Sequence, residues 1–413
     1  KLVAVGALAL DANTTADDNT AVGFCALTTN TTGCRNVAMG CGSLKTNLTG
    51  DRNTALGHIA MEGNTSADNN TAVGYAALNV NTTGTALVAV GANALTANTT
   101  ADNNTALGRE ALGANTTGAS NTAVGCGALV ANTTASNNTA VGRSALSANT
   151  VGHSNTGIGQ GALQATTDGD QNTAIGNSAL TTATTAGSNT AVGHDALKAT
   201  TTGGQNNAFG DGAMVANTTG CRNVAMGNGV MIKNTEGECN VALGHIALQC
   251  NTTGDQNVAI GASTLHKNTT ACYNTAVGHI SMSCTTTGAS NTAVGTLSLS
   301  ANTTGEQNTA VGVCALNANT TGSRNVAFGR HALDTNVSGN SNTAIGDQSL
   351  FASTASNNLA VGFFSMADNT SGTLNTAVGQ NALSNNTTAN CNTAVGSNAL
   401  CVNTTGCENT AIG

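Results

Sequence analysis

The chain is a tandem repeat of a 17-residue unit, and this period constrains the fold more than any other feature. One unit is NTAVGTLSLSANTTGEQ, residues 291–307, and the next copy begins at Asn308. The first unit starts at Leu2, and 24 full units precede a short fragment that starts at Asn409. Every unit has 17 residues except the one that starts at Asn342, which has 16. Because a unit this short cannot bury a core by itself, successive units must stack on one another.

All units share one order of residues, which we number from position 1 to position 17. Positions 1 to 5 are typically Asn-Thr-Ala-Val-Gly, with an apolar residue at position 4 and glycine at position 5 in every unit. Positions 8 and 9 are typically Ala-Leu, and positions 12 to 15 are Asn-Thr-Thr-Gly or Asn-Thr-Thr-Ala. Two short apolar segments between Gly, Asn and Thr predict short strands joined by turns, since a fixed central glycine disfavours a helix. The sequence therefore predicts an all-β fold, a parallel β-solenoid (β-roll) with one 17-residue repeat per coil and about 24 coils.

The repeat also predicts what each position does. We expect the side chains at positions 4 and 9 to point into the solenoid, each over its copy in the next coil. The glycine at position 5 indicates a corner with positive φ or a close approach of two backbones. The asparagines at positions 1 and 12 can cap turns and form stacked amide ladders. In the 16-residue unit, the missing residue falls between Leu350 and Ala355, so we expect a shortened turn and an intact strand.

Composition supports one ordered, fibrous array rather than several globular domains. No shift of composition divides residues 1–413, and both ends fall within the repeat, so we expect a fragment of a longer fibrous protein. Charged residues make up 8% of the chain, against roughly 25% in ordinary soluble domains. No basic patch indicates nucleic acid as a partner, and no run of 18 apolar residues indicates membrane insertion within this stretch.

Three repeats carry a resemblance to known fibrous proteins. The segments Asn-Val-Ala-Met-Gly at 223–227, Asn-Val-Ala-Leu-Gly at 240–244 and Asn-Val-Ala-Ile-Gly at 257–261 resemble the Ser-Val-Ala-Ile-Gly signature of trimeric autotransporter adhesin heads. The whole unit is similar to repeats in tail-fibre-like proteins of phages and other viruses. The resemblance implies a parallel β-roll in which three chains associate as a stalk or adhesive head on a cell or virion surface. The present chain differs from the adhesin heads in its longer period and its many cysteines.

The sequence contains no constellation that predicts catalysis, a metal site or a cofactor. The histidines at position 6, namely His58, His194, His245 and His279, are never in adjacent coils, so they cannot converge on one ion. We therefore expect a structural fibre shaft or adhesin spacer that is exposed outside a cell or on a virion, with self-association as a homotrimer or filament. A module that binds a receptor or a host-surface glycan along the shaft is the alternative. An ice-binding solenoid, based on the recurring threonines, is a weaker third alternative.

The 13 cysteines are expected at outward-facing, variable positions. Three pairs lie about one coil apart, where stacked backbones come close enough for a disulfide. Each pair is one position out of register, so free surface thiols remain the alternative. The candidate disulfides are Cys25 with Cys41, Cys221 with Cys239, and Cys391 with Cys407.

Asparagine at position 12 usually begins an Asn-x-Ser/Thr sequence, the acceptor pattern for N-glycosylation. Asn149 and Asn234 remain where this pattern is broken, which favours a structural role of asparagine in the turn. Glycosylation would require the side chain to point outward. The candidate acceptors are Asn13, Asn30, Asn47, Asn64, Asn81, Asn98, Asn115, Asn132, Asn217, Asn251, Asn268, Asn302, Asn319, Asn336, Asn369, Asn386 and Asn403.

Overall fold

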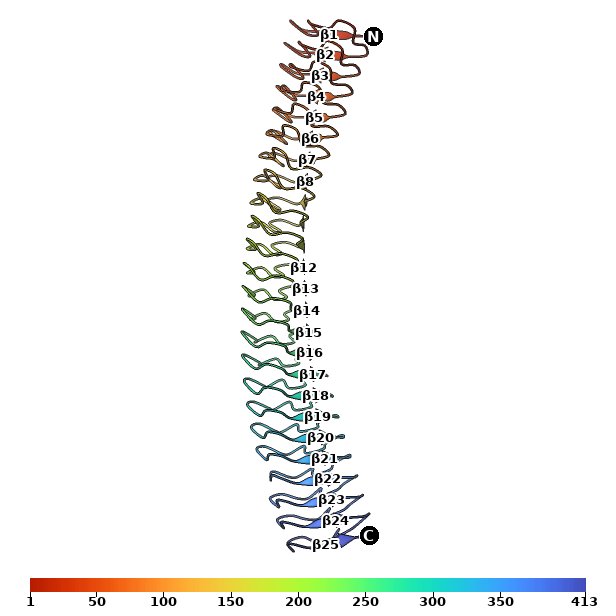
Figure 1. The fold of residues 1–413 in the computed structure, drawn as a ribbon, viewed down its shortest axis with the longest axis vertical. Helices are drawn as coiled ribbons and strands as arrows, with labels where there is room; N and C mark the ends of the chain where they lie inside the picture. Colours follow the sequence, from red (N-terminus) through yellow and green to blue (C-terminus); the bar gives the residue numbers. More distant parts are fainter. The chain divides into compact units, whose positions relative to one another are not determined.

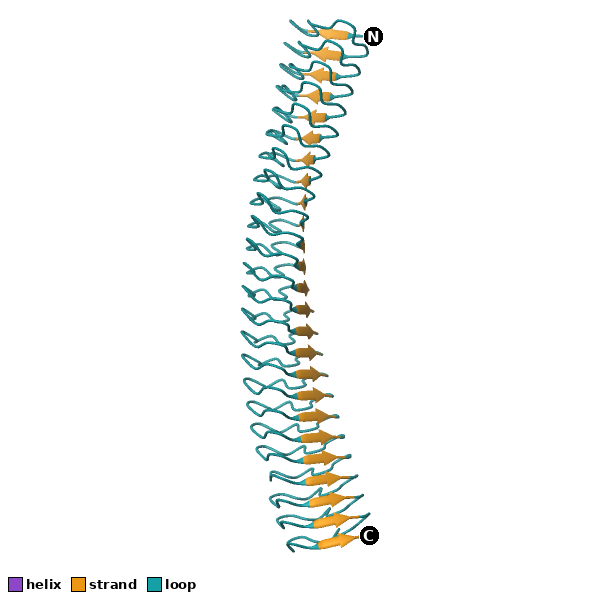
Figure 2. Ribbon diagram, viewed as in Figure 1, coloured by secondary structure: helices purple, strands orange, loops and turns teal.

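A computed structural model describes residues 1–413 as two compact units, Lys1–Asn206 and Asn207–Gly413. In each unit, coils of one repeat stack on one another, and each coil contributes a single three-residue strand at positions 2 to 4 (Figures 1 and 2). There is no helix, and the remaining residues form turns and irregular structure. The predicted parallel β-solenoid is confirmed.

The strands recur once per repeat. In the first unit they are β1 (Val3–Val5), β2 (Thr20–Val22), β3 (Val37–Met39), β4 (Thr54–Leu56), β5 (Thr71–Val73), β6 (Val88–Val90), β7 (Thr105–Leu107), β8 (Thr122–Val124), β9 (Thr139–Val141), β10 (Thr156–Ile158), β11 (Thr173–Ile175) and β12 (Thr190–Val192). In the second unit they are β13 (Asn207–Phe209), β14 (Val224–Met226), β15 (Val241–Leu243), β16 (Val258–Ile260), β17 (Thr275–Val277), β18 (Thr292–Val294), β19 (Thr309–Val311), β20 (Val326–Phe328), β21 (Thr343–Ile345), β22 (Leu359–Val361), β23 (Thr376–Val378), β24 (Thr393–Val395) and β25 (Thr410–Ile412).

Neighbouring strands within each unit pair in parallel and in strict register. In the pair β8 and β9, for example, Ala123 lies beside Ala140, so each residue stacks on its own copy. The Ala-Leu segment at positions 8 and 9 does not form the second strand that we expected. It lies in a turn, because positions 7 and 9 adopt left-handed backbone conformations, such as φ 51° at Leu129. An extended strand cannot continue through such residues.

The interior is narrow and is filled by small and medium side chains. Position 9 is fully buried in every coil from Leu27 to Leu383, which confirms the expectation for this position. The alanine at position 3 is also fully buried, as at Ala21 and Ala123. Because the interior has this fixed width, position 9 accepts Leu or Met but has no room for a larger side chain.

The expectation that position 4 points inward is wrong. Val124 and its counterparts are half-buried or exposed, with an exposed fraction of 56% at Phe328. Successive side chains of a strand point to opposite faces, so an inward alanine at position 3 forces positions 2 and 4 outward. Residue size at the two positions carries this signal in the sequence: position 4 ranges from Val to Phe, whereas position 3 is nearly always alanine.

The glycine at position 5 meets both conditions that the sequence suggested. Gly125 has φ 133°, a value that L-residues rarely adopt. A Cβ atom there would lie 2.6 Å from the carbonyl oxygen of Gly142 in the next coil. The backbones therefore approach too closely for any side chain, which explains why glycine occupies this position in every unit.

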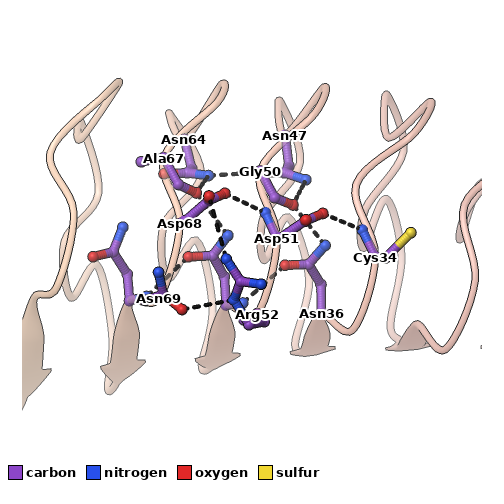
Figure 3. Close-up of polar contacts among 12 residues, drawn as sticks. Cys34, Asn36, Asn47, Gly50, Asp51, Arg52, Asn64, Ala67, Asp68 and Asn69 are labelled. Carbon is purple, nitrogen blue, oxygen red and sulfur yellow. Dashed lines mark hydrogen bonds and ion pairs between the residues drawn. The ribbon is translucent and has the colours of Figure 1, made fainter.

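Two buried asparagines hold each coil together. The side chains of Asn36 at position 1 and Asn47 at position 12 donate to the same carbonyl oxygen, that of Gly50 at position 15, over 2.8 and 3.0 Å (Figure 3). The Oδ1 atom of Asn36 accepts the backbone N–H of Asn53 in the next coil over 2.9 Å. The Nδ2 atom of Asn64 donates to Oδ1 of Asn47 over 2.7 Å. The expected amide ladders are therefore present, and they satisfy polar groups that would be costly to bury unpaired.

The ladder at position 12 is interrupted where asparagine is replaced. Thr166 follows Asn149, and Thr285 follows Asn268, and in both places the threonine cannot extend the chain of amides. The Oδ1 atoms of both asparagines and the hydroxyls of both threonines are buried without a hydrogen-bond partner. The interrupted ladder therefore leaves buried polar atoms unpaired in these coils.

The 16-residue coil keeps its strand and shortens its turn, as predicted. β21 and β22 remain in register, with Ala344 beside Ala360. Ser353 takes position 12, is fully buried, and accepts a hydrogen bond from Nδ2 of Asn369 over 3.2 Å. The residue that would follow Thr354 at position 14 is the one that is missing, so the change is confined to the exposed turn.

Restoring the amide ladder should stabilise the protein. We expect Thr285→Asn to raise the free energy of unfolding by about 1 kcal/mol, because the new Nδ2 can donate to Asn268 and to the Gly288 carbonyl. Thr287→Asn, at an exposed position of the same turn, is the matched control and should change little. Urea unfolding followed by circular dichroism measures both variants. Equal midpoints for the two variants would contradict the role of the ladder.

Two glycines of one coil should differ sharply in their tolerance of a side chain. Gly125→Ala places a Cβ against the next backbone at an unfavourable φ, and we expect a loss of about 3 kcal/mol. Gly127 at position 7 has φ 66°, a Cβ added there would meet no other atom within 4 Å, and other coils have Ala or Ser at this position. Gly127→Ala should cost about 1 kcal/mol, the ordinary penalty of a left-handed residue. Thermal unfolding of both variants tests the difference, and a similar loss in both would show that the close approach is not limiting.

Candidate interaction surface

The outward side chains of the strands form one surface in each unit, which we call the strand face. It consists of positions 2 and 4 of the strands β1 to β12 and of β13 to β25. Position 4 is Val, Ile, Leu, Met or Phe in every strand, and position 2 is Thr or Val except at Asn207 and Leu359. No charged residue occurs at either position.

The strand face leaves large apolar side chains in contact with solvent. Leu107 is 47% exposed, and Ile158 is 38% exposed. With strands roughly 4.8 Å apart and alternate residues about 6.6 Å apart, each coil adds roughly 30 Å², so each unit presents about 400 Å². Roughly half of this area is the apolar row at position 4, and apolar patches of a few hundred Å² on a monomer are often functional. The strand face is therefore the candidate interaction surface.

Charged side chains are absent from the strand face itself, and several of them pair with a charge in the next coil. Arg330 and Asp347, both at position 6, lie 3.0 Å apart, and Lys45 and Glu62, both at position 10, lie 3.4 Å apart. These pairs are exposed to solvent and contribute little to stability. Ion pairs between neighbouring coils therefore form at the corners and turns.

A further ladder, at position 16, is one that the sequence analysis did not predict. The backbone N–H of Cys34 donates to Oδ1 of Asp51, and that of Asp51 donates to Oδ1 of Asp68, each over 2.7 Å (Figure 3). Ser136 and Asn390 accept the same bond in other coils. The signal in the sequence is the frequent choice of Asp, Ser, Asn, Thr or Cys at a position that otherwise varies.

The cysteines are free thiols, and the three candidate disulfides are not formed. Most cysteines are exposed or half-buried as expected, but Cys25 is buried while its proposed partner Cys41 is exposed. In the pair Cys391 and Cys407, the sulfur of Cys407 at position 16 accepts the N–H of Asn390 over 3.4 Å. Cys391 is at position 17 with a left-handed backbone, φ 60°. The one-residue offset thus gives the two side chains different directions; Cys221 and Cys239 share the same two positions.

The asparagines of the candidate glycosylation sites lie inside the solenoid. Except for Asn13 and Asn403 in the first and last full coils, which are half-buried, all of them are fully buried. Asn132 is typical: its Nδ2 donates to Asn115 over 2.8 Å and to the Ala135 carbonyl over 3.0 Å. A sugar on this nitrogen would remove one of its two N–H donors, and so at least one of these hydrogen bonds, and would not fit between the coils. In the folded chain the Asn-Thr-Thr segment is therefore a structural turn.

The histidines do not converge. His58 stacks on Tyr75 with ring centroids 5.7 Å apart, and the four histidines at position 6 remain in separate parts of the stack. Burial, together with Lys267 and Lys233, lowers the pKa of His266 below its ordinary value. No group of three or more His, Cys, Asp or Glu side chains is placed to hold a metal ion.

One irregular feature adjoins the strand face of the second unit. A hollow of about 400 Å³ beside the short coil is lined by Ser341, Asn357, Leu359 and Leu374, among others. Leu374 is 60% exposed. Four of the chain's six phenylalanines occur in the three coils that span residues 325–374, at Phe328, Phe351, Phe363 and Phe364. Large aromatic side chains are therefore more frequent in these three coils than in the rest of the repeat.

Treatment with an N-glycosidase should release no sugar from the buried asparagines at position 12. The exposed asparagines that begin an Asn-Asn-Thr sequence, namely Asn69, Asn103, Asn137 and Asn385, are outside this prediction. The buried amides at position 12 make hydrogen bonds that a sugar would abolish, so folded chains should carry no glycan there. Peptide mass mapping of protein from a glycosylating host, before and after the enzyme, tests this at each asparagine. A reporter protein with an exposed Asn-x-Thr site, made in the same cells, is the control. A mass loss spread over several of the candidate sites would show that the turn is not the only role of these residues.

No helix in the structure combines the length and the apolarity that a membrane crossing requires.

Comparison with known proteins does not identify a family for the chain. No protein-family model matches the chain, and no curated protein matches it either. The fold and its surfaces therefore carry the functional argument.

Proposed function

We propose that the protein is a structural fibre shaft or adhesin spacer, exposed outside a cell or on a virion. The observation that carries this proposal is that the coils of each unit repeat the same register, and even the coil that lacks a residue keeps it. Such a fold adds length with each repeat without adding a new site. A spacer needs this property, and an enzyme does not.

The distribution of variable residues supports the same proposal. Charges are scattered over the corners and turns, and they pair mainly with neighbouring coils. The interior is closed by alanine, leucine and asparagine, so it offers no cavity for a substrate. By the resemblance of the repeat, we further propose that copies of the chain associate, with a homotrimer as the expected state.

Recognition of a receptor or a glycan along the shaft is the second candidate function. It is favoured by the hollow beside the short coil and by the phenylalanines that occur in the same three coils. Phe363 and Phe364 form an edge-on pair with centroids 4.4 Å apart, and Phe363 is 47% exposed. A glycan array probed with the wild type and with Phe363→Ser tests this function; binding lost in the variant would support it.

The ice-binding alternative gains no such support. Ice recognition calls for a flat, regular array, whereas position 4 of the strand face varies between Val, Met and Phe. The threonines at positions 13 and 14 lie in a turn, and those at position 13 use their hydroxyls within the stack, as in the 3.0 Å bond from Thr116 to the Thr133 carbonyl.

Removal of whole coils should shorten the protein without unfolding it. Deletion of residues 87–188 removes six complete repeats, and we expect the longest dimension to fall by about 29 Å at roughly 4.8 Å per coil. The melting temperature should change little, because each coil contacts only its neighbours. Small-angle scattering and circular dichroism measure the two quantities.

Deletion of residues 87–180 is the matched control, because it ends inside a coil and joins position 17 to position 10. This variant should lose stability, since the amide ladders and strands no longer meet in register. If both deletions were equally stable, or if the in-register deletion left the longest dimension unchanged, the spacer proposal would fail.

A further inference from the structure

The geometry points to the strand face as the surface through which copies of this chain pack side by side. The inference rests on the proposed fibre and identifies the residues that join its chains. The occupant of the strand face is a second copy of the same chain, aligned with the first so that the strand face of one meets that of the other. This contact joins two copies and therefore departs from the homotrimer that the resemblance implies.

The chemistry of the strand face suits contact with itself. It contains no charged side chain in either unit, so two identical faces can meet without repulsion or unpaired charge. Its exposed residues are those that prefer an interior, such as Ile158, Ile175 and Ile260, each about two-fifths exposed. The threonines at position 2 add methyl groups to the face and carry no charge.

The period of the strand face favours a second copy over an unrelated partner. Position-4 side chains form a row with one side chain per coil, roughly 4.8 Å apart. A second copy has the same spacing, so its row can fit between the side chains of the first along the whole unit. A partner with another repeat would lose this match within a few coils. Self-complementary contacts of this kind are the basis of symmetric oligomers.

The available area is sufficient for a specific interface. Each unit offers about 400 Å² on its strand face, so two matching units that pair bury on the order of 800 Å², and the two pairs of units together on the order of 1,600 Å². This is the size of a standard stable interface. The other sides of the coil offer less, because the corners and turns carry the charged residues and the exposed threonines of position 14.

The middle of the first unit provides a clean test. From Asn69 to Gln205, position 17 beside the strand face is also free of charge. Leu107→Lys together with Ile158→Lys places two charges on the face, three coils apart, where an exposed lysine is tolerated in a single chain. We expect the dissociation constant for self-association to rise about 100-fold, because each lysine would be buried in the contact without a partner.

Thr83→Lys together with Thr134→Lys is the matched control, since both residues are exposed at position 14 and also lie three coils apart. Sedimentation velocity over a range of concentrations measures association, and circular dichroism confirms that all variants are folded. We expect the control to associate like the wild type and the face variant to be monomeric at micromolar concentration.

The inference would be overturned by a wild type that stays monomeric, or by a face variant that associates as the wild type does. Thermal hysteresis by a monomeric wild type would instead assign the strand face to ice. If the wild type is monomeric but the deletion of residues 87–188 still shortens the protein as expected, this inference fails and the spacer proposal stands. The two proposals can therefore fail separately.

Discussion

Two asparagine amides that meet at one carbonyl oxygen are the interaction on which the rest of the solenoid depends. In the coil around Gly50, they join the start of the strand to the distant turn and so close the coil. The same side chains also reach the next coil, through Asn53 and Asn64. One residue type thus supplies closure within a coil and adhesion between coils. Without it, buried backbone groups of the turns would have no partner, and the thin interior could not compensate for their desolvation.

The coil that these amides close is locally strained. Positions 7, 9 and 17 adopt left-handed conformations, including Leu146 at φ 52° and Asn137 at φ 63°, each of which costs about 1–2 kcal/mol for an ordinary residue. Burial of one leucine per coil, about 1.5–3 kcal/mol, offsets only part of that cost. A single coil therefore has no stable existence, and stability arises from interfaces between neighbours. This explains why the register is kept so strictly, even around Ser353 in the short coil.

The solenoid has polar side chains in its interior and apolar side chains on part of its surface, which is the reverse of the usual arrangement. Asparagine amides occupy the interior, whereas Val, Ile and Phe occupy the outer face of the strands. A strand three residues long can place only one side chain inside, and close packing of the two sides of the coil limits that residue to alanine. The larger apolar residues therefore remain on the outer face of the single chain. Packing of copies through the strand face, as we infer, gives these residues the burial that the coil denies them.

The sequence by itself determined the solenoid, its period, the buried leucine, the glycine corner and the asparagine ladders, because each depends on one residue type recurring at one place. It also located the shortened turn near Ser353. Only the tertiary structure decided which side of the strand is inside. From the sequence, either the alanine at position 3 or the valine at position 4 could face the interior. The alanine does so because Gly125 and Gly142 bring adjacent backbones close together and the closed coil is narrow. The direction of the cysteines and the burial of Asn132 depend on the same closure, so neither could be deduced from spacing alone.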